Sequence, residues 1–146
     1  MDGHRTVADL LLKNNATVDA RDRVGRTALH IACQNGNLKL ASLLLQYKAT
    51  VDARDHFQRT PLHVASLYAD RVAALLLQNN ADVNARDIDH CTPLHYVVEN
   101  GHLEVAKVLL QHSADVDAVN KDKQTPLDLA YSEKDHVEFS ALLLKY

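Results

Sequence analysis

Three histidines recur along the chain and are the first residues to examine for chemistry. His30, His63 and His95 lie 33 and 32 residues apart, each three positions after a threonine. A metal site needs about four ligands, usually supplied in closely spaced pairs. One histidine in each long interval supplies no such pair, so the spacing predicts a structural role that recurs from repeat to repeat.

The only compact group of histidine and cysteine residues consists of His90, Cys91 and His95. It lacks a fourth ligand and a recognisable zinc spacing, so we predict no metal ion. The sequence also has no glycine-rich phosphate loop, no G-x-S-x-G nucleophile motif and no H-E-x-x-H zinc motif. These observations predict a protein that is not an enzyme and needs no cofactor.

Arginine and apolar residues gather in three short segments, 20–26, 53–59 and 85–91. The arginines are Arg21, Arg23, Arg26, Arg54, Arg59 and Arg86, and the apolar residues are Val24, Phe57 and Ile88. Arginine is enriched at the hot spots of protein interfaces, where its planar fork pairs well with carboxylates. Single exposed apolar residues are common on any surface, but their coincidence with arginine in neighbouring segments favours a binding surface.

The elements that must position these side chains repeat in constant phase. Thr-Ala-Leu-His at 27–30 recurs as Thr-Pro-Leu-His at 60–63 and 92–95, and as Thr-Pro-Leu-Asp at 125–128. Leucine-rich triplets recur at 10–12, 43–45, 75–77, 108–110 and 142–144. Val-Asp-Ala at 18–20 recurs at 51–53, 83–85 (as Val-Asn-Ala) and 116–118. Three such series establish an internal repeat of about 33 residues.

The period and the Thr-Pro-Leu-His element resemble the ankyrin repeat, over nearly the whole chain. The resemblance implies an all-α solenoid of stacked helix-turn-helix units, each with a β-turn finger. Threonine followed by proline suits the start of a helix, because threonine caps it and the missing N–H of proline would be unpaired there anyway. We expect first helices at 28–35, 61–67, 93–100 and 126–133, second helices at 4–13, 38–47, 70–79, 103–112 and 136–145, and fingers at 20–26, 53–59, 85–91 and 118–124.

We expect a single domain over residues 1–146, with a half-repeat at 1–20 and repeats at 21–53, 54–85, 86–118 and 119–146. The half-repeat lacks a first helix, which favours a fragment of a longer chain. Its Val7, Leu10 and Leu11 would then offer a site for weak self-association of an otherwise monomeric protein. Irregular turns are expected near 67–70, where one residue is missing, and near 134–136, where one is added.

Several positions of the repeat depart from the family pattern. The glycine that the family places in the finger matches Gly25 alone, and the other fingers have Gln58, His90 and Lys123 there. The glycine that ends the second helix is replaced by Asn15, Lys48, Asn80 and Ser113. If these positions need a positive φ, seven residues with side chains must adopt the left-handed conformation.

The resemblance implies a protein-interaction module whose fingers and first helices line a concave groove. The matching residues are Arg21, Arg23, Val24, Arg26, Gln34, Asn35, Arg54, His56, Phe57, Arg59, Leu67, Tyr68, Arg86, Ile88, Asp89, Cys91, Glu99, Asn100, Lys121 and Asp122. We expect a protein partner with an acidic and apolar contact surface. Two alternatives stay open: a structural spacer within a longer ankyrin array, and an effector or inhibitor that mimics a host ankyrin protein.

Composition narrows the partner and the compartment. The formal charge of −3 and the aspartates between the arginines argue against nucleic acid. No apolar run reaches the length of a membrane span. Two cysteines, Cys33 and Cys91, are fewer than a secreted scaffold of this size would carry, so reduced thiols in the cytoplasm or nucleus are expected. Asn84 follows a Leu…Asp-Val-Asn pattern that resembles the acceptor of asparaginyl hydroxylases, although an asparagine that only braces its finger is the stronger interpretation.

Overall fold

The computed structural model describes residues 3–68, 70–132 and 137–146. Its helices are α1 (Gly3–Lys13), α2 (Ala28–Gln34), α3 (Leu38–Gln46), α4 (Pro61–Tyr68), α5 (Asp70–Gln78), α6 (Pro93–Glu99), α7 (Leu103–Gln111), α8 (Pro126–Ser132) and α9 (Val137–Leu143). Most ends agree with the expected ranges to within one or two residues. No strand forms in these three ranges, so the predicted all-α repeat solenoid is confirmed.

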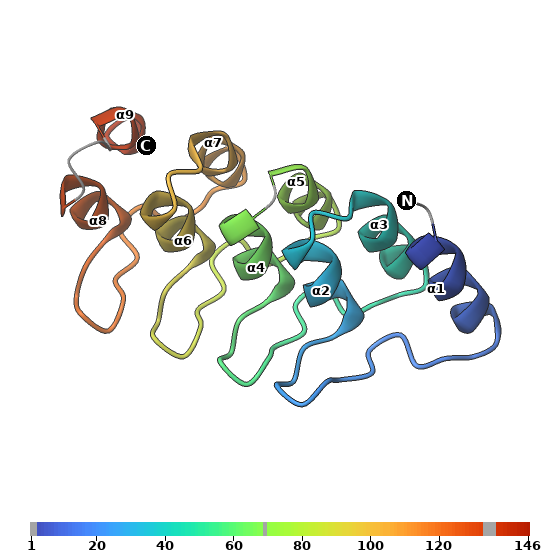
Figure 1. The fold of residues 1–146 in the computed structure, drawn as a ribbon. Helices are drawn as coiled ribbons and strands as arrows, with labels where there is room; N and C mark the ends of the chain where they lie inside the picture. The colour runs from blue at the N-terminus through green and yellow to red at the C-terminus, as the bar shows by residue number, and fades with distance from the viewer. Residues whose placement is uncertain (1–2, 69, 133–136) are drawn as a thin grey trace.

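The helices stand in two rows (Figure 1). We call α2, α4, α6 and α8 the inner helices, and α1, α3, α5, α7 and α9 the outer helices. Each inner helix contacts the next inner helix and the outer helix that follows it in the chain. The four fingers, at 20–26, 53–59, 85–91 and 118–124, project side by side from one edge of this double row (Figure 1).

Stacking produces the hydrophobic core. Leu29, Leu62 and Leu94 occupy the same position in three inner helices, and each is fully buried. Leu76 and Leu109 likewise occupy one repeated position in the outer helices α5 and α7, and both are fully buried. Because each repeat alone would leave these side chains facing solvent, the stability of the solenoid depends on the contacts between neighbouring repeats.

The left-handed positions expected from the repeat are present. Gln58, His90 and Lys123 have φ values of 60°, 61° and 60°, and the helix-terminating Asn15, Lys48, Asn80 and Ser113 have values of 63–65°. Gly25, at φ 80°, is needed for a second reason, because a Cβ there would lie 2.6 Å from Cδ2 of His56. Elsewhere the fold accepts the modest cost of a side chain in this conformation.

The sequence predicts irregular turns between the two helices of a repeat near 67–70 and near 134–136. In the second repeat, α4 ends at Tyr68 and α5 begins at Asp70, whereas Gly36 and Gly101 open the longer turns of the neighbouring repeats at φ 60° and 72°. Nε2 of His102, from the following repeat, lies 2.7 Å from the carbonyl oxygen of Leu67 and satisfies the end of α4. The insertion expected near 134–136 lies outside the described residues.

The first outer helix has fewer neighbours than the others. Leu10 and Leu11 are 62% and 55% exposed, whereas Leu43 and Leu44, at the same positions of α3, are 5% and 2% exposed. No helix in the described ranges is long and apolar enough to cross a membrane.

We therefore expect the amides of α1 to exchange with solvent well before those of α4 and α5. Local opening of α1 breaks few contacts, whereas opening of the central repeat disrupts packing on both sides. Hydrogen exchange followed by mass spectrometry measures this order. Protection of α1 that exceeds that of α4, or that rises steeply with protein concentration, would mean that another molecule covers Leu10 and Leu11.

Candidate interaction surface

The fingers and the inner helices form one continuous face, which we call the finger face. Neighbouring fingers are joined by single backbone hydrogen bonds close to their tips. His56 donates to the Val24 carbonyl at 3.0 Å, Ile88 to that of Phe57 at 2.9 Å, and Lys121 to that of Asp89 at 2.9 Å. The tips therefore hold a fixed spacing, which suits a surface that must recognise a partner without rearranging.

A carboxylate or amide at one repeated position folds each finger on itself. Asp22, Asp55, Asp87 and Asn120 each accept two backbone N–H groups, from the residues two and four positions further along. Asp55 and Asp87 are only 2% and 6% exposed. From the sequence, these aspartates argue only against nucleic acid, whereas in the structure they fold the fingers. Their recurrence in phase with the histidines was the signal of a structural role.

Arginines at another repeated position tie each finger to the next. Arg54 uses Nη1 to donate to the carbonyl of Gln58 in its own finger and, at 2.7 Å, to that of Arg86 in the next. Arg21 makes the same pair of bonds to Gly25 and Arg54. Arg86 completes the series with a longer bond of 3.5 Å to Val119.

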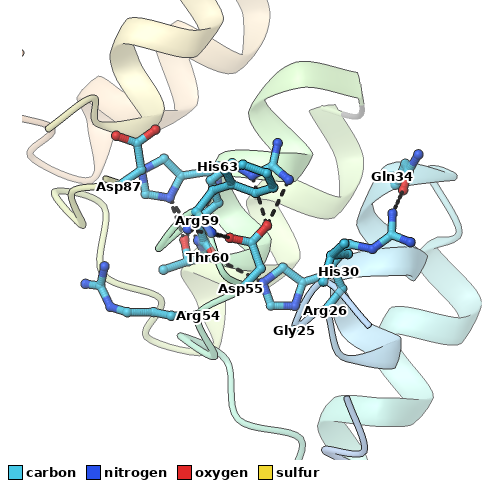
Figure 2. Close-up of polar contacts among 12 residues, drawn as sticks. Gly25, Arg26, His30, Gln34, Arg54, Asp55, Arg59, Thr60, His63 and Asp87 are labelled. Atoms are coloured by element: carbon cyan, nitrogen blue, oxygen red, sulfur yellow. Dashed lines mark hydrogen bonds and ion pairs between the residues drawn. The ribbon is translucent and has the colours of Figure 1, made fainter. Parts of the chain in front are cut away.

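Two further arginines, Arg26 and Arg59, form ion pairs within their own repeats. Figure 2 shows the contact of Arg59 with Asp55 and that of Arg26 with Gln34. Arg26 donates from Nε to Oδ2 of Asp22 at 2.9 Å and from Nη1 to Oε1 of Gln34 at 3.0 Å. Arg59 donates from Nε and Nη2 to Oδ2 of Asp55, at 3.0 and 2.8 Å. Its guanidinium also lies 4.9 Å from the ring centre of Phe57, a cation–π distance.

These contacts give most of the finger arginines a structural role. Five of the six arginines already bond within the protein, whereas within the described ranges no residue bonds to Arg23. The sequence predicts that acidic groups of a partner pair with these arginines. Since five of the six already have partners within the protein, Arg23 is the arginine that best fits this prediction. Substitution of Arg54 would disturb two fingers as well as any partner contact.

The three recurring histidines connect the repeats in series. Nδ1 of His63 accepts the Thr60 backbone N–H at 3.1 Å, and its Nε2 lies 3.0 Å from the Cys91 carbonyl oxygen of the next repeat. His30 reaches Arg59, and His95 reaches Gln124, in the same way. A carbonyl oxygen only accepts, so Nε2 must carry the proton while Nδ1 stays unprotonated. The predicted structural role is confirmed.

Burial keeps these imidazoles neutral. It lowers the pKa of His63 to about 4, and it also lowers the pKa values of His30 and His95. The last repeat has Asp128 in place of the histidine. Its carboxylate accepts the N–H of Thr125 at 2.8 Å, and its own N–H donates to the Thr125 hydroxyl at 3.2 Å.

The third repeat differs from the first two at the ion pair. Cys91 stands where they carry Arg26 and Arg59, and Glu99 stands at the position of Gln34. Asp87 accepts a hydrogen bond from the hydroxyl of Tyr96 at 2.7 Å instead of one from a guanidinium. Tyr96 is a residue that we did not single out from the sequence, because a tyrosine within a helix gives no sign of what its hydroxyl reaches.

Exposed apolar side chains on the finger face lie between these polar contacts. Phe57 is 51% exposed, Ile88 47% and Val24 38%, and Tyr68 at the end of α4 is 60% exposed. A small hollow beside Tyr68 and Leu67 is also lined by Arg26, Gln34 and Arg59. In the second repeat, Phe57 and Tyr68 thus each neighbour the guanidinium of Arg59, and aromatic residues and arginine are both enriched at protein interfaces.

None of the twenty residues expected on the binding surface is buried. Arg26, Arg59, Leu67 and Cys91 are half-buried and the rest are exposed. Asn35 and Asn100 end α2 and α6, and Lys121 lies 3.4 Å from Asp89 across two fingers. The expected set thus comes from the fingers and from the inner helices or their ends, with Asp122 in the last finger, and its role in binding stays a prediction.

The thiols and Asn84 take structural positions. Cys33 and Cys91 are both free, and burial raises the pKa of Cys91 to about 12 and that of Cys33 further still, so neither is a ready nucleophile. Oδ1 of Asn84 accepts the Asp115 N–H at 2.8 Å, and its Nδ2 donates to the Ser113 carbonyl at 3.3 Å. These two bonds link successive repeats, and hydroxylation of Asn84 stays a proposal.

No group of ligating side chains in the described ranges is arranged to hold a metal ion. A search of curated proteins finds no match to this sequence. A family model described as "Ankyrin repeats (3 copies)" matches residues 1–87 and 87–146. With the phased helices, the fingers and the histidine connections, this match shows that the chain belongs to the ankyrin repeat family.

Proposed function

We propose that the protein binds another protein through the finger face, without catalysing a reaction. Ankyrin repeats are generally protein–protein interaction modules. The observation that carries the proposal is that two exposed aromatic side chains, Phe57 and Tyr68, each neighbour the guanidinium of Arg59; we call these three residues the patch. Aromatic side chains with a neighbouring arginine supply much of the energy of known interfaces.

The scaffold supports this proposal because it holds the patch rigidly. Phe57 donates its backbone N–H to Asp55 and accepts from Ile88 through its carbonyl, so its finger is fixed at both sides. A partner therefore loses little free energy to ordering of this surface, which favours tight binding from a small contact.

The same contacts define the partner. We propose a segment with an apolar side chain that covers Phe57 and Tyr68 and a carboxylate that reaches Arg23. Nucleic acid fits less well, because the carboxylates of Asp22 and Asp55 neutralise Arg26 and Arg59. The free thiols of Cys33 and Cys91 support a reducing compartment, the cytoplasm or the nucleus.

We expect Phe57→Ala to weaken binding by about 1–2 kcal/mol, a roughly 5- to 30-fold rise in Kd, with an unchanged fold. The ring is half exposed, so its loss removes partner contact and little core packing. The matched control is Leu38→Ala, which removes a 37% exposed apolar side chain from the outer helices. Leu38 also lines a hollow on the outer helices, together with Arg71 and Leu75, that is larger than the hollow beside Tyr68. The Leu38→Ala variant therefore also tests the outer helices as an alternative binding surface.

Quantitative capture from a lysate with the wild type and both variants, followed by titration of the captured protein, measures the effect. If Phe57→Ala still binds the partner and Leu38→Ala does not, the binding surface lies on the outer helices and not on the finger face. Arg54→Ala serves as a third arm, because its two bonds between fingers predict a loss of stability as well as of binding.

A further inference from the structure

We propose that the hollow beside Leu38 binds an acidic, partly apolar segment of a protein, as a second site that is separate from the finger face. We call this hollow the outer hollow. It lies along α3 and α5, which stand side by side in the outer row (Figure 1), and Arg5 of α1 also lines it. The finger face and the outer hollow lie on different rows of helices, so the protein can hold two protein segments at the same time.

The outer hollow is large enough to receive side chains of another protein. Its volume is about 590 Å³, within the range of about 300–1,000 Å³ that is typical of ligand pockets. A second hollow over the turn at 35–37 adjoins it, because Leu38, Lys39 and Arg71 line both. Two adjoining hollows form an elongated depression. Such a shape suits a chain segment that places successive side chains along it better than it suits a compact ion.

Aliphatic side chains form part of the wall of the outer hollow. Leu38 begins α3 and is 37% exposed, and Ala74 and Leu75 of α5 are half-buried. Long basic side chains such as those of Lys39 and Arg71 add apolar surface through their methylene groups. A simple anion gains nothing from these contacts, so we expect the ligand to carry an apolar side chain of its own.

Positive charge surrounds this apolar surface. Arg5, Lys39 and Arg71 line the outer hollow from three different helices, and no carboxylate is found among the described residues that line it. The charge of the whole chain is divided in the same way. Residues 1–78, which contain the outer hollow, carry ten arginines and lysines against seven acidic residues, whereas residues 79–146 carry six against twelve. The outer hollow is therefore complementary to carboxylates, although the net charge of the protein is −3.

The two kinds of wall identify the class of ligand. Phosphate and nucleic acid supply negative charge but no aliphatic side chain to cover Leu38 and Leu75. A segment in which leucines lie between glutamates or aspartates supplies both. Its apolar side chains would enter the outer hollow while its carboxylates reach the surrounding basic groups.

The test uses a capped tetrapeptide of two leucines between two glutamates as the probe. Amide chemical shifts of the labelled protein are followed by NMR during titration at low salt. We expect saturable shifts at Lys39, Arg71 and Gln78, and weaker binding at high salt. Two control peptides replace either the glutamates by glutamines or the leucines by serines. Each control should bind about threefold more weakly or worse, because it lacks one of the two kinds of contact.

Variants of the protein locate the site. Arg71→Gln should raise the Kd of the probe about threefold, as expected for loss of one exposed ion pair. The matched control is Lys48→Gln, which removes the same charge beyond the far end of α3, away from the outer hollow. Ser42→Glu places a carboxylate in the outer hollow and should weaken the probe more than Ser42→Gln, which has nearly equal size and no charge. Leu38→Ala should weaken the probe and leave the partner on the finger face bound.

Equal binding of the probe and both control peptides, or equal effects of Arg71→Gln and Lys48→Gln in proteins with otherwise native spectra, would overturn the proposal. Inorganic phosphate that shifts the same amides and binds more tightly than the probe would show a simple anion site and would also overturn it. Phe57→Ala should leave the probe titration unchanged. If the probe fails to bind while Phe57→Ala still weakens the captured partner, the outer hollow is not a binding site and the proposed function stands.

Discussion

Replacing His63 with alanine is expected to lower the free energy of unfolding by about 3 kcal/mol. The imidazole is fully buried and joins the Thr60 N–H to the Cys91 carbonyl of the next repeat. Its loss leaves a void, a donor and an acceptor in the middle of the solenoid. Urea denaturation followed by circular dichroism measures the change.

Two companion variants separate the causes. His63→Leu keeps most of the volume and removes both hydrogen bonds, so it isolates the polar contribution. His56→Ala alters an exposed finger histidine and should stay within about 0.5 kcal/mol of the wild type. If His63→Ala costs no more than His56→Ala, the histidine series does not hold the repeats together.

Acidification from pH 7.5 to pH 5 is expected to destabilise the protein by about 2 kcal/mol through His63 alone. Burial lowers the pKa of His63 from 6.5 to about 4 in the folded state. The unfolded chain therefore binds more protons between these values, and the stability that is complete above pH 6.5 declines as the pH falls towards 4. His30 and His95, whose pKa values are also lowered, add losses of the same sign.

The carboxyl groups contribute little to this slope. Hydrogen bonds lower the pKa values of Asp9, Asp22 and Asp128 from 3.8, so these groups also lose stability in acid, but only at a pH below the window from 7.5 to 5. The pKa values of Asp52 and Glu99 are raised by burial, so these two groups act in the opposite direction in acid. Denaturation curves at several pH values, for the wild type and for His63→Leu, measure the contribution of His63. A slope that is as steep in His63→Leu as in the wild type would show that other groups cause the acid sensitivity.

The fold could be predicted because repetition makes the sequence redundant. The series of Thr-Pro-Leu-His motifs, leucine triplets and Val-Asp-Ala motifs fixed the phase of every helix, even where Lys48 or Gln58 replaces the glycine of the family. Backbone requirements of the stack outweigh the local preference of such a residue, which is why its positive φ could also be anticipated.

The partners of the finger arginines could not be predicted in the same way. Arg23 and Arg54 lie in the same kind of segment, yet Arg54 joins two fingers whereas no described residue bonds to Arg23. A long arginine side chain can reach solvent, its own finger or the next, and only the spacing between fingers decides. The bond between Tyr96 and Asp87 was hidden for the same reason, since it joins an inner helix to a finger.

The most direct test of the proposed finger face is a hydrogen-exchange footprint of the protein in complex with the partner that it captures. The account predicts slower exchange in the fingers at 53–59 and 85–91 and in the inner helices α4 and α6, with α3, α5 and α7 unchanged. Protection confined to the outer helices, with exchange at Phe57 and its neighbours as fast as in the free protein, would contradict it.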